Sequence, residues 1–230
     1  MPMLNQRMFM LPGALFVAVC LATCLAACSA SPEKTAQPRE LSAARQTVQK
    51  AAALPDPAGF RRDLGMARAV LIVSPNAGGV ALARTPGSNT LSAPAFYAVT
   101  QVNAATGSGG TGFSRTPQRQ ELLAAFMTED SMDWLKNPAL PGKGGLRMEA
   151  AAASPEQRAR ADVLVLDLKT PNARSVNLET ALISVDAQAN QAFFGKPITP
   201  AEIFSLRPPH ASEAGALQQS LAALAQERKP

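Results

Sequence analysis

The residue with the most distinctive chemistry is Cys28, which follows Leu25, Ala26 and Ala27. A leucine and two small residues before a cysteine form a bacterial lipobox, in which the thiol sulfur accepts a diacylglyceryl group. Small side chains are needed there because the signal peptidase binds the segment in extended form beside the bilayer. We therefore predict that Cys28 is lipidated and becomes the first residue of the mature chain.

The residues before Cys28 have the composition of an export signal. Arg7 is the only charged residue among the first ten, and the stretch from Met8 to Ala27 carries no charge. A basic start, an apolar stretch and a small-residue exit are typical of a secretory leader, so residues 1–27 are predicted to be a lipoprotein signal peptide. A transmembrane anchor and an ordinary signal cut elsewhere are the alternatives.

Removal of this leader would also remove Cys20 and Cys24. No thiol would then be left for a disulfide, a catalytic nucleophile or a metal site. Attachment by two or more acyl chains holds a protein stably on a membrane. Ser29 stands where an aspartate would retain an enteric lipoprotein in the inner membrane, which favours an outer-membrane location facing the periplasm and leaves surface exposure open. The polar residues 28–39 are predicted to be a flexible tether.

No residue pattern in the chain predicts an enzyme. His210 is the only histidine, so a Ser–His–Asp triad would have to use it, and there is no Gly-x-Ser-x-Gly elbow. The glycine-rich residues 107–112 lack the lysine and the Ser/Thr that follow in a phosphate-binding loop. We interpret His210 as a surface residue and predict no catalytic residue and no cofactor.

Two groups of oxygen-bearing side chains could suggest a metal site. Glu129, Asp130 and Asp133 lie close together, but acidic residues at the start of a helix more often complement its amides and dipole. Asp186 and Asn190 fit a turn better than a calcium loop, which needs more carboxylates at fixed spacing. We therefore predict no metal site.

A basic and apolar group is the candidate binding site. It consists of Phe60, Arg61, Arg62 and Arg68, and the chain has a net charge of +5. Basic and apolar residues together can bind a lipid surface, and each basic residue adds about 1 kcal/mol of attraction near an anionic membrane. A solvated helix face is the alternative. Nucleic acid is not expected as a partner outside the cytoplasm.

Hydrophobic periodicity predicts both helices and strands. Residues 122–127 have helical propensity, but Thr128 is a good N-cap for a helix running to residue 136, so 122–127 form a separate element. Residues 148–160 are alanine-rich and show no clear pattern. Helices are predicted at residues 40–54, 58–69, 199–204 and 212–228, strands at 70–73, 80–83, 95–102, 162–168 and 181–185, and a turn at 186–190 before a returning segment with Phe193 and Phe194.

Three segments occur in a characteristic order: a basic helix end with an apolar strand at residues 68–75, the stretch 125–135 around Met127-Thr128, and Gly-x-x-Ile-Thr-Pro at 195–200. In this order they resemble the SYLF-domain family, lipid-binding proteins that include actin-linked proteins of yeast and animals and secreted bacterial proteins. The resemblance covers about residues 41–206. It implies an α+β fold with a β-rich curved sheet or barrel-like core, flanking N-terminal and C-terminal helices, and a strand at 122–127.

The expected organisation has a signal peptide at 1–27, a tether at 28–39, a SYLF-like domain at 40–207 and a C-terminal tail, in part helical, at 208–230. We expect a non-enzymatic bacterial envelope lipoprotein whose domain contacts membrane phospholipid. The alternative is a structural or protein-interaction module for an envelope protein partner, with membrane contact supplied by the acyl chains alone.

Overall fold

The computed structural model describes residues 39–85, 90–104, 113–117, 120–138, 145–174, 181–207 and 212–226. All of these residues belong to the compact unit Gln37–Pro230. The predicted leader, Cys28, residues 107–112 and His210 lie outside the described residues.

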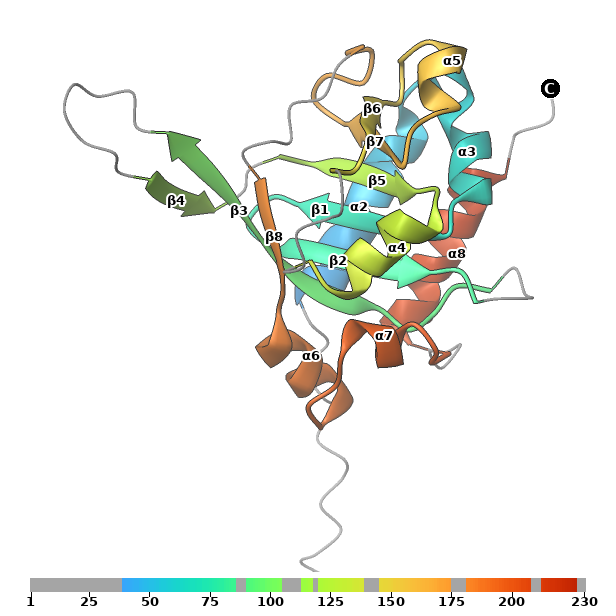
Figure 1. Cartoon of the computed structure of the whole chain (residues 1–230). Helices are drawn as coiled ribbons and strands as arrows, with labels where there is room; N and C mark the ends of the chain where they lie inside the picture. Colours follow the sequence, from blue (N-terminus) through green and yellow to red (C-terminus); the bar gives the residue numbers. More distant parts are fainter. Residues whose placement is uncertain are drawn as a thin grey trace, which may run out of the picture. The chain divides into compact units, whose positions relative to one another are not determined.

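An eight-stranded mixed sheet forms the centre of this unit (Figure 1). The strands lie in the order β4-β3-β2-β1-β5-β7-β6, with β8 paired to β3, and β6 and β7 are parallel whereas the other pairs are antiparallel. The described sheet is open, so of the two predicted forms the curved sheet is confirmed and the closed barrel is not. The strands are β1 Ala69–Ser74, β2 Gly78–Ala83, β3 Ala95–Ala104, β4 Phe113–Pro117, β5 Leu122–Phe126, β6 Met148–Ala150, β7 Val163–Asp167 and β8 Ala181–Val185.

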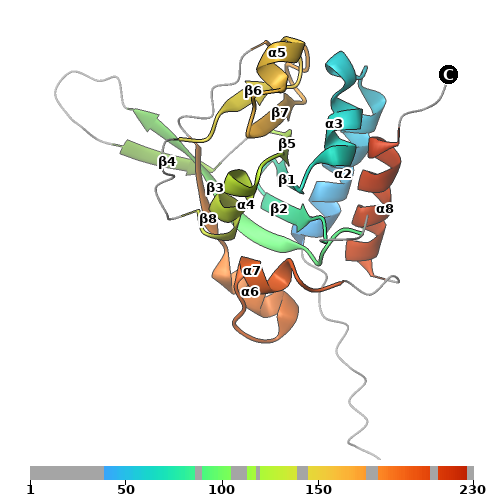
Figure 2. The ribbon, with the colours of Figure 1, turned by 45° about the vertical axis from the view of Figure 1, so that its right-hand side comes forward.

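Helices cover the sheet on both faces. Figure 2 shows α2 and α8 side by side on one face, and α3 packs against α8. The other face is covered by α4 and the short α7. The helices are α2 Arg39–Ala53, the 3-10 turn η1 Pro57–Gly59, α3 Phe60–Met66, α4 Glu129–Lys136, α5 Pro155–Arg158, α6 Ala187–Phe194, α7 Pro200–Ile203 and α8 Glu213–Ala225.

This layering explains the continuous apolar runs in the sequence. Side chains alternate between the faces of a strand, so Val70 and Ile72 pack with α2 and α8 while Leu71 and Val73 pack with α4. β1 is therefore buried along its whole length. A strand covered on both faces is expected to be apolar at every position rather than at every second one.

The turn between β1 and β2 depends on two residues with positive φ. Asn76 has a φ of 57° and Gly78 a φ of 73°. A Cβ atom on Gly78 would lie 2.6 Å from the carbonyl oxygen of Tyr97, so β2 can pair with β3 this closely only because residue 78 lacks a side chain.

The predicted helix starts at Thr128 and Thr199 are confirmed. The Thr128 hydroxyl accepts a hydrogen bond from the Ser131 N–H (3.3 Å), and the Ser131 hydroxyl oxygen accepts one from the Thr128 N–H (3.2 Å). Thr199 and Glu202 form the same reciprocal capping box at α7. Each box satisfies amides that a helix start leaves without intrahelical partners, and the one at Thr128 fixes the boundary between β5 and α4.

The turn predicted at residues 186–190 is wrong, because a helix begins there. Asp186 caps α6 by accepting a hydrogen bond from the Ala189 N–H (2.9 Å), and the following Ala-Gln-Ala stretch has high helix propensity. Asn190 is buried. Its side-chain oxygen accepts a hydrogen bond from the Phe96 N–H (2.9 Å), and its amide nitrogen donates one to the Phe96 carbonyl (3.1 Å). It thereby fastens α6 to β3.

The predicted domain end at residue 207 is also corrected by the structure. Leu217, Leu221 and Leu224 of α8 are buried in the layer shared with α2 and α3. The predicted helix at 212–228 is confirmed as a helix, but it completes the core rather than forming a tail, because its apolar face covers the sheet.

Candidate functional site: an arginine rim at one end of the sheet

Backbone hydrogen bonds bring five distant segments together at one end of the sheet. We call these segments the backbone row; they are the residues that end β2 and β5 and those that precede β1, β6 and β7. Neighbouring strands are only about 4.8 Å apart, so their end residues form one continuous border. The Arg84 N–H donates to the Arg68 carbonyl (2.6 Å), and the Arg68 N–H donates to the Phe126 carbonyl (2.8 Å). Farther along, the Met127 N–H donates to the Asp162 carbonyl (2.8 Å), and the Asp162 N–H donates to the Arg147 carbonyl (2.9 Å).

Exposed cationic and apolar side chains gather along this border. Met66 is 60% exposed and Met148 is 40% exposed. They are two of the three large hydrophobic side chains that are exposed in the part of the chain that the structure describes. Exposed arginines accompany both methionines. We call this set the arginine rim; it consists of Arg62, Met66, Arg68, Arg147, Met148 and Arg160.

A buried ion pair fixes the two sides of the rim to each other. Asp63 of α3 and Arg158 of α5 form a salt bridge, and their side chains are only 9% and 7% exposed. Arg62 and Arg160 therefore lie next to a fixed contact between the two helices. The pair contributes no free charge to the surface, since the carboxylate compensates the guanidinium.

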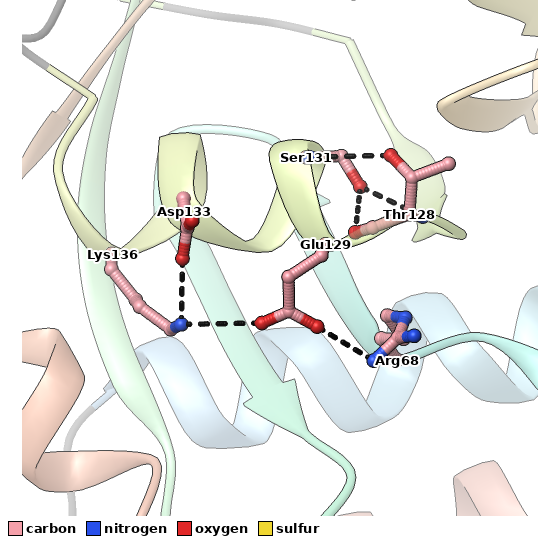
Figure 3. Close-up of polar contacts among 6 residues, drawn as sticks. All are labelled: Arg68, Thr128, Glu129, Ser131, Asp133 and Lys136. Carbon is pink, nitrogen blue, oxygen red and sulfur yellow. Dashed lines mark hydrogen bonds and ion pairs between the residues drawn. The ribbon is translucent and has the colours of Figure 1, made fainter.

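The other charges of the rim differ in how far they are compensated. Arg68 donates to Glu129 (2.7 Å), and Lys136 lies 3.7 Å from the same carboxylate and 2.8 Å from Asp133 (Figure 3). These side chains are between 33% and 66% exposed, so the network is a solvated one of small net stabilisation.

Arg147 and Arg160 differ from Arg68 in this respect. Among the described residues, neither guanidinium takes part in an ion pair, and both side chains are exposed. Of the rim cations, these two are the most available to an external anion.

The structure separates the four residues that the sequence predicted as lipid contacts. Phe60 is 1% exposed and packs in the core, so the prediction that it touches lipid does not fit its position. Arg61 donates to the carbonyls of Ala52 (3.0 Å) and Leu54 (2.8 Å) at the end of α2. Only Arg62 and Arg68 of the predicted group belong to the rim.

Met66, Arg147, Met148 and Arg160 were missed by the sequence interpretation. A signal was present, because Met66 stands two residues before Arg68 and Met148 directly follows Arg147. Their proximity depends on β1, β5, β7 and β6 being neighbours in the sheet, and this order is not visible in the sequence.

A second polar cluster lies at the other end of β1. Thr47 donates to Glu121 (3.0 Å) and lies 3.0 Å from the Ser74 hydroxyl, and Lys50 donates to both Glu121 oxygens (2.8 and 3.0 Å). Thr47 and Ser74 are buried, and each polar group has a partner. The cluster therefore fastens α2 to the sheet and satisfies polar groups that burial would otherwise penalise.

Three of the carboxylates weighed as metal ligands have structural partners. Glu129 and Asp133 belong to the ion-pair network, and Asp186 caps α6. Within the part of the chain that the structure describes, no group of three or more His, Cys, Asp or Glu side chains could hold a metal ion. No helix of the described residues combines the length and apolar character needed to span a membrane.

Comparisons with protein-family models, with curated proteins and with solved structures found no match to this chain. The SYLF resemblance therefore stays a prediction from sequence.

Proposed function

We propose that this protein is a bacterial envelope lipoprotein whose domain rests on an anionic phospholipid surface through the arginine rim. In this proposal Cys28 carries the acyl anchor in the outer membrane, and residues 28–39 link it to the domain on the periplasmic side. The observation that carries the proposal is the pairing of exposed methionines with exposed arginines at one end of the sheet.

Two physical contributions support the rim as the membrane contact. Each basic residue near an anionic leaflet contributes about 1 kcal/mol of attraction. Burial of apolar surface adds about 25 cal/mol per Å², which Met66 and Met148 provide when they enter the headgroup region. The sum is a weak and reversible contact, and the predicted acyl chains would supply the permanent attachment.

The sequence resemblance agrees with this proposal but does not carry it. SYLF-family proteins bind lipid, and the segment from Arg68 to Pro75 that resembles them begins in the rim. Neither the family assignment nor the location in the outer membrane is needed for the rim argument.

Vesicle flotation tests the proposal. The protein comprising residues 29–230 keeps the whole unit Gln37–Pro230 and lacks the acyl anchor, so the domain alone must supply any binding. We expect it to float with vesicles containing phosphatidylglycerol at low salt, to float less as salt screens the charges, and not to float with pure phosphatidylcholine.

Charge reversal in the rim provides the matched comparison. The double variant Arg147→Glu/Arg160→Glu changes two exposed cations and should weaken binding at least about tenfold. Arg174→Glu/Lys196→Glu makes the same change in net charge at exposed residues outside the rim and should bind like the wild type. Equal losses in both variants would contradict the rim and indicate attraction by net charge alone. No wild-type binding would contradict the rim and favour a module anchored only by its acyl chains.

The lipidation of Cys28 is tested separately. Mass measurement of the mature polypeptide from its native membrane should find residues 28–230 with an acylated N-terminal cysteine. An unmodified thiol or a retained leader would refute the anchoring part of the proposal and leave the rim untouched.

A further inference from the structure

A cavity of about 480 Å³ lies between α3, α8 and the segment that follows β2. Its volume falls within the range of small-molecule sites, about 300–1,000 Å³. Buried leucine and valine side chains form its apolar floor: Leu64, Val70 and Leu221. The cavity lies beside the rim, because Arg84 lines it and belongs to the same backbone row as Arg68.

The polar part of the cavity has one sign of charge. Arg84 and Arg207 line it, and none of the described lining residues is acidic. Arg84 is held in place by hydrogen bonds from its guanidinium to the carbonyls of Gly65 (2.8 Å) and Ala67 (3.1 Å). Burial lowers the pKa of Arg84, but a guanidinium remains charged at neutral pH. The cavity therefore has a fixed cation, and Arg207 adds an exposed one.

Glutamine side chains complete the polar side. Gln218 donates to the carbonyls of Leu91 and Ser92, which orients its amide at the wall of the cavity. Gln219 and Gln226 also line it. These amides supply further hydrogen-bonding groups beside the two arginines.

The geometry points to a binding site for a single-chain anionic amphiphile, with its acyl chain on the apolar floor and its carboxylate or phosphate at the arginines. An inorganic anion would leave the apolar floor unused, and a cationic amphiphile would be repelled by Arg84 and Arg207. The inference rests on the proposed function only in taking the membrane next to the rim as the source of the ligand. Binding of a monomeric ligand in solution tests the cavity without any vesicle.

Calorimetric titration of the protein comprising residues 29–230 is the direct test. The ligands are dodecanoate, dodecyl phosphate, dodecyltrimethylammonium and inorganic phosphate, each below its micelle concentration where it forms micelles. We expect one of the two anionic amphiphiles, or both, to bind at one site per chain. The tighter of the two identifies the headgroup as a carboxylate or a phosphate.

Matched tryptophan substitutions on α8 locate the ligand. Ala222 is exposed and lines this cavity, whereas its exposed neighbour Ala223 lines a different groove, against α2. Ala222→Trp should weaken binding at least tenfold, and Ala223→Trp should leave the dissociation constant within twofold of the wild type. Circular dichroism should show both variants folded, since neither position is in the core.

A charge variant keeps the inference testable if Ala222→Trp does not fold. Arg207→Gln removes an exposed cation without adding bulk and should weaken the anionic amphiphile about three- to tenfold, as expected for a partly solvated charge-assisted hydrogen bond. The inference would be overturned if dodecyltrimethylammonium or inorganic phosphate bound as tightly as the anionic amphiphile. It would also be overturned if Ala222→Trp and Arg207→Gln left the binding of the anionic amphiphile unchanged. Failure of vesicle flotation alone would not, because that measures the rim.

Discussion

Removal of the Asp63 carboxylate is the perturbation whose cost follows most directly from the structure. Asp63 is the buried partner of Arg158, and Arg62 is the other nearby cation, with its Nε 3.6 Å from the carboxylate. In Asp63→Ala the Arg158 guanidinium, whose side chain is 7% exposed, keeps its charge because arginine cannot lose its proton near neutral pH. The variant therefore removes the carboxylate that compensates this buried cation.

The expected cost is large for a single substitution. Breaking a buried ion pair by removing one partner costs about 3–5 kcal/mol. For a domain of this size each kcal/mol lowers the melting temperature by about 2–4 °C, so we expect a decrease of roughly 6–20 °C. Replacing both partners, as in Asp63→Leu/Arg158→Met, removes the uncompensated charge and should recover most of the lost stability.

Urea unfolding followed by the fluorescence of the single tryptophan, Trp134, measures these changes. Asp133→Ala is the control, since Asp133 is 66% exposed and, among the residues that the structure describes, its ion pair is with the partly exposed Lys136 at 2.8 Å. An exposed pair of this kind is worth about 0–1 kcal/mol. If Asp63→Ala costs no more than Asp133→Ala, then the Asp63–Arg158 pair does not hold α3 to α5 as described.

Three further substitutions test the fold. Burial raises the pKa of Tyr97 well above its ordinary value near 10. The free energy of unfolding should therefore be insensitive to this group below pH 10 and should fall above pH 10, where only the unfolded phenol ionises. Absorbance at 295 nm reports this ionisation alone, because the chain has one tyrosine. Tyr97→Phe should abolish that absorbance change and cost about 1 kcal/mol by removing the 2.7 Å hydrogen bond to the Leu135 carbonyl. Leu217→Ala in α8 should cost about 2–5 kcal/mol in urea unfolding, whereas a cost below about 1 kcal/mol would mean that α8 is a tail after all. Gly78→Ala should destabilise more than Gly145→Ala, since both glycines have positive φ but only Gly78 faces a carbonyl at 2.6 Å; equal thermal shifts would refute the close approach.

Local signals predicted most of the secondary structure. The apolar run at Val70, the N-cap at Thr128 and the leucine spacing of α8 each depend on neighbours a few residues apart, and the structure contains the elements they predicted. The segment 186–190 is the exception. Aspartate and asparagine favour both turns and helix caps, and only the packing of Asn190 against Phe96 decides between them.

The misassignment of Phe60 could have been avoided from spacing. Phe60 and Leu64 are four residues apart and share one face of α3, and both are buried. Arg61 and Arg62 between them do not share that face. The neighbouring arginines suggested an interfacial site, but helical periodicity already separates the aromatic ring from them.

The rim itself could not be predicted, because it depends on contacts between distant segments. Arg68 and Arg147 are 79 positions apart in the chain, and they approach each other only through the intervening ends of β5 and β7. Strand order in a mixed sheet is set by packing of all the elements together, so no local pattern around residue 147 indicates its neighbours.

The most direct test of the rim places an environment-sensitive NBD fluorophore at single cysteines in the protein comprising residues 29–230, which has no native cysteine. The labelled variants are Met66→Cys and Met148→Cys in the rim and Ala192→Cys at an exposed position of α6. On adding phosphatidylglycerol vesicles, we predict a blue shift and increased intensity for the two rim labels and no change for Ala192→Cys. A shift at Ala192→Cys without one at the rim positions would show that another face of the domain meets the membrane, and no shift at any position would show that the domain does not meet it at all.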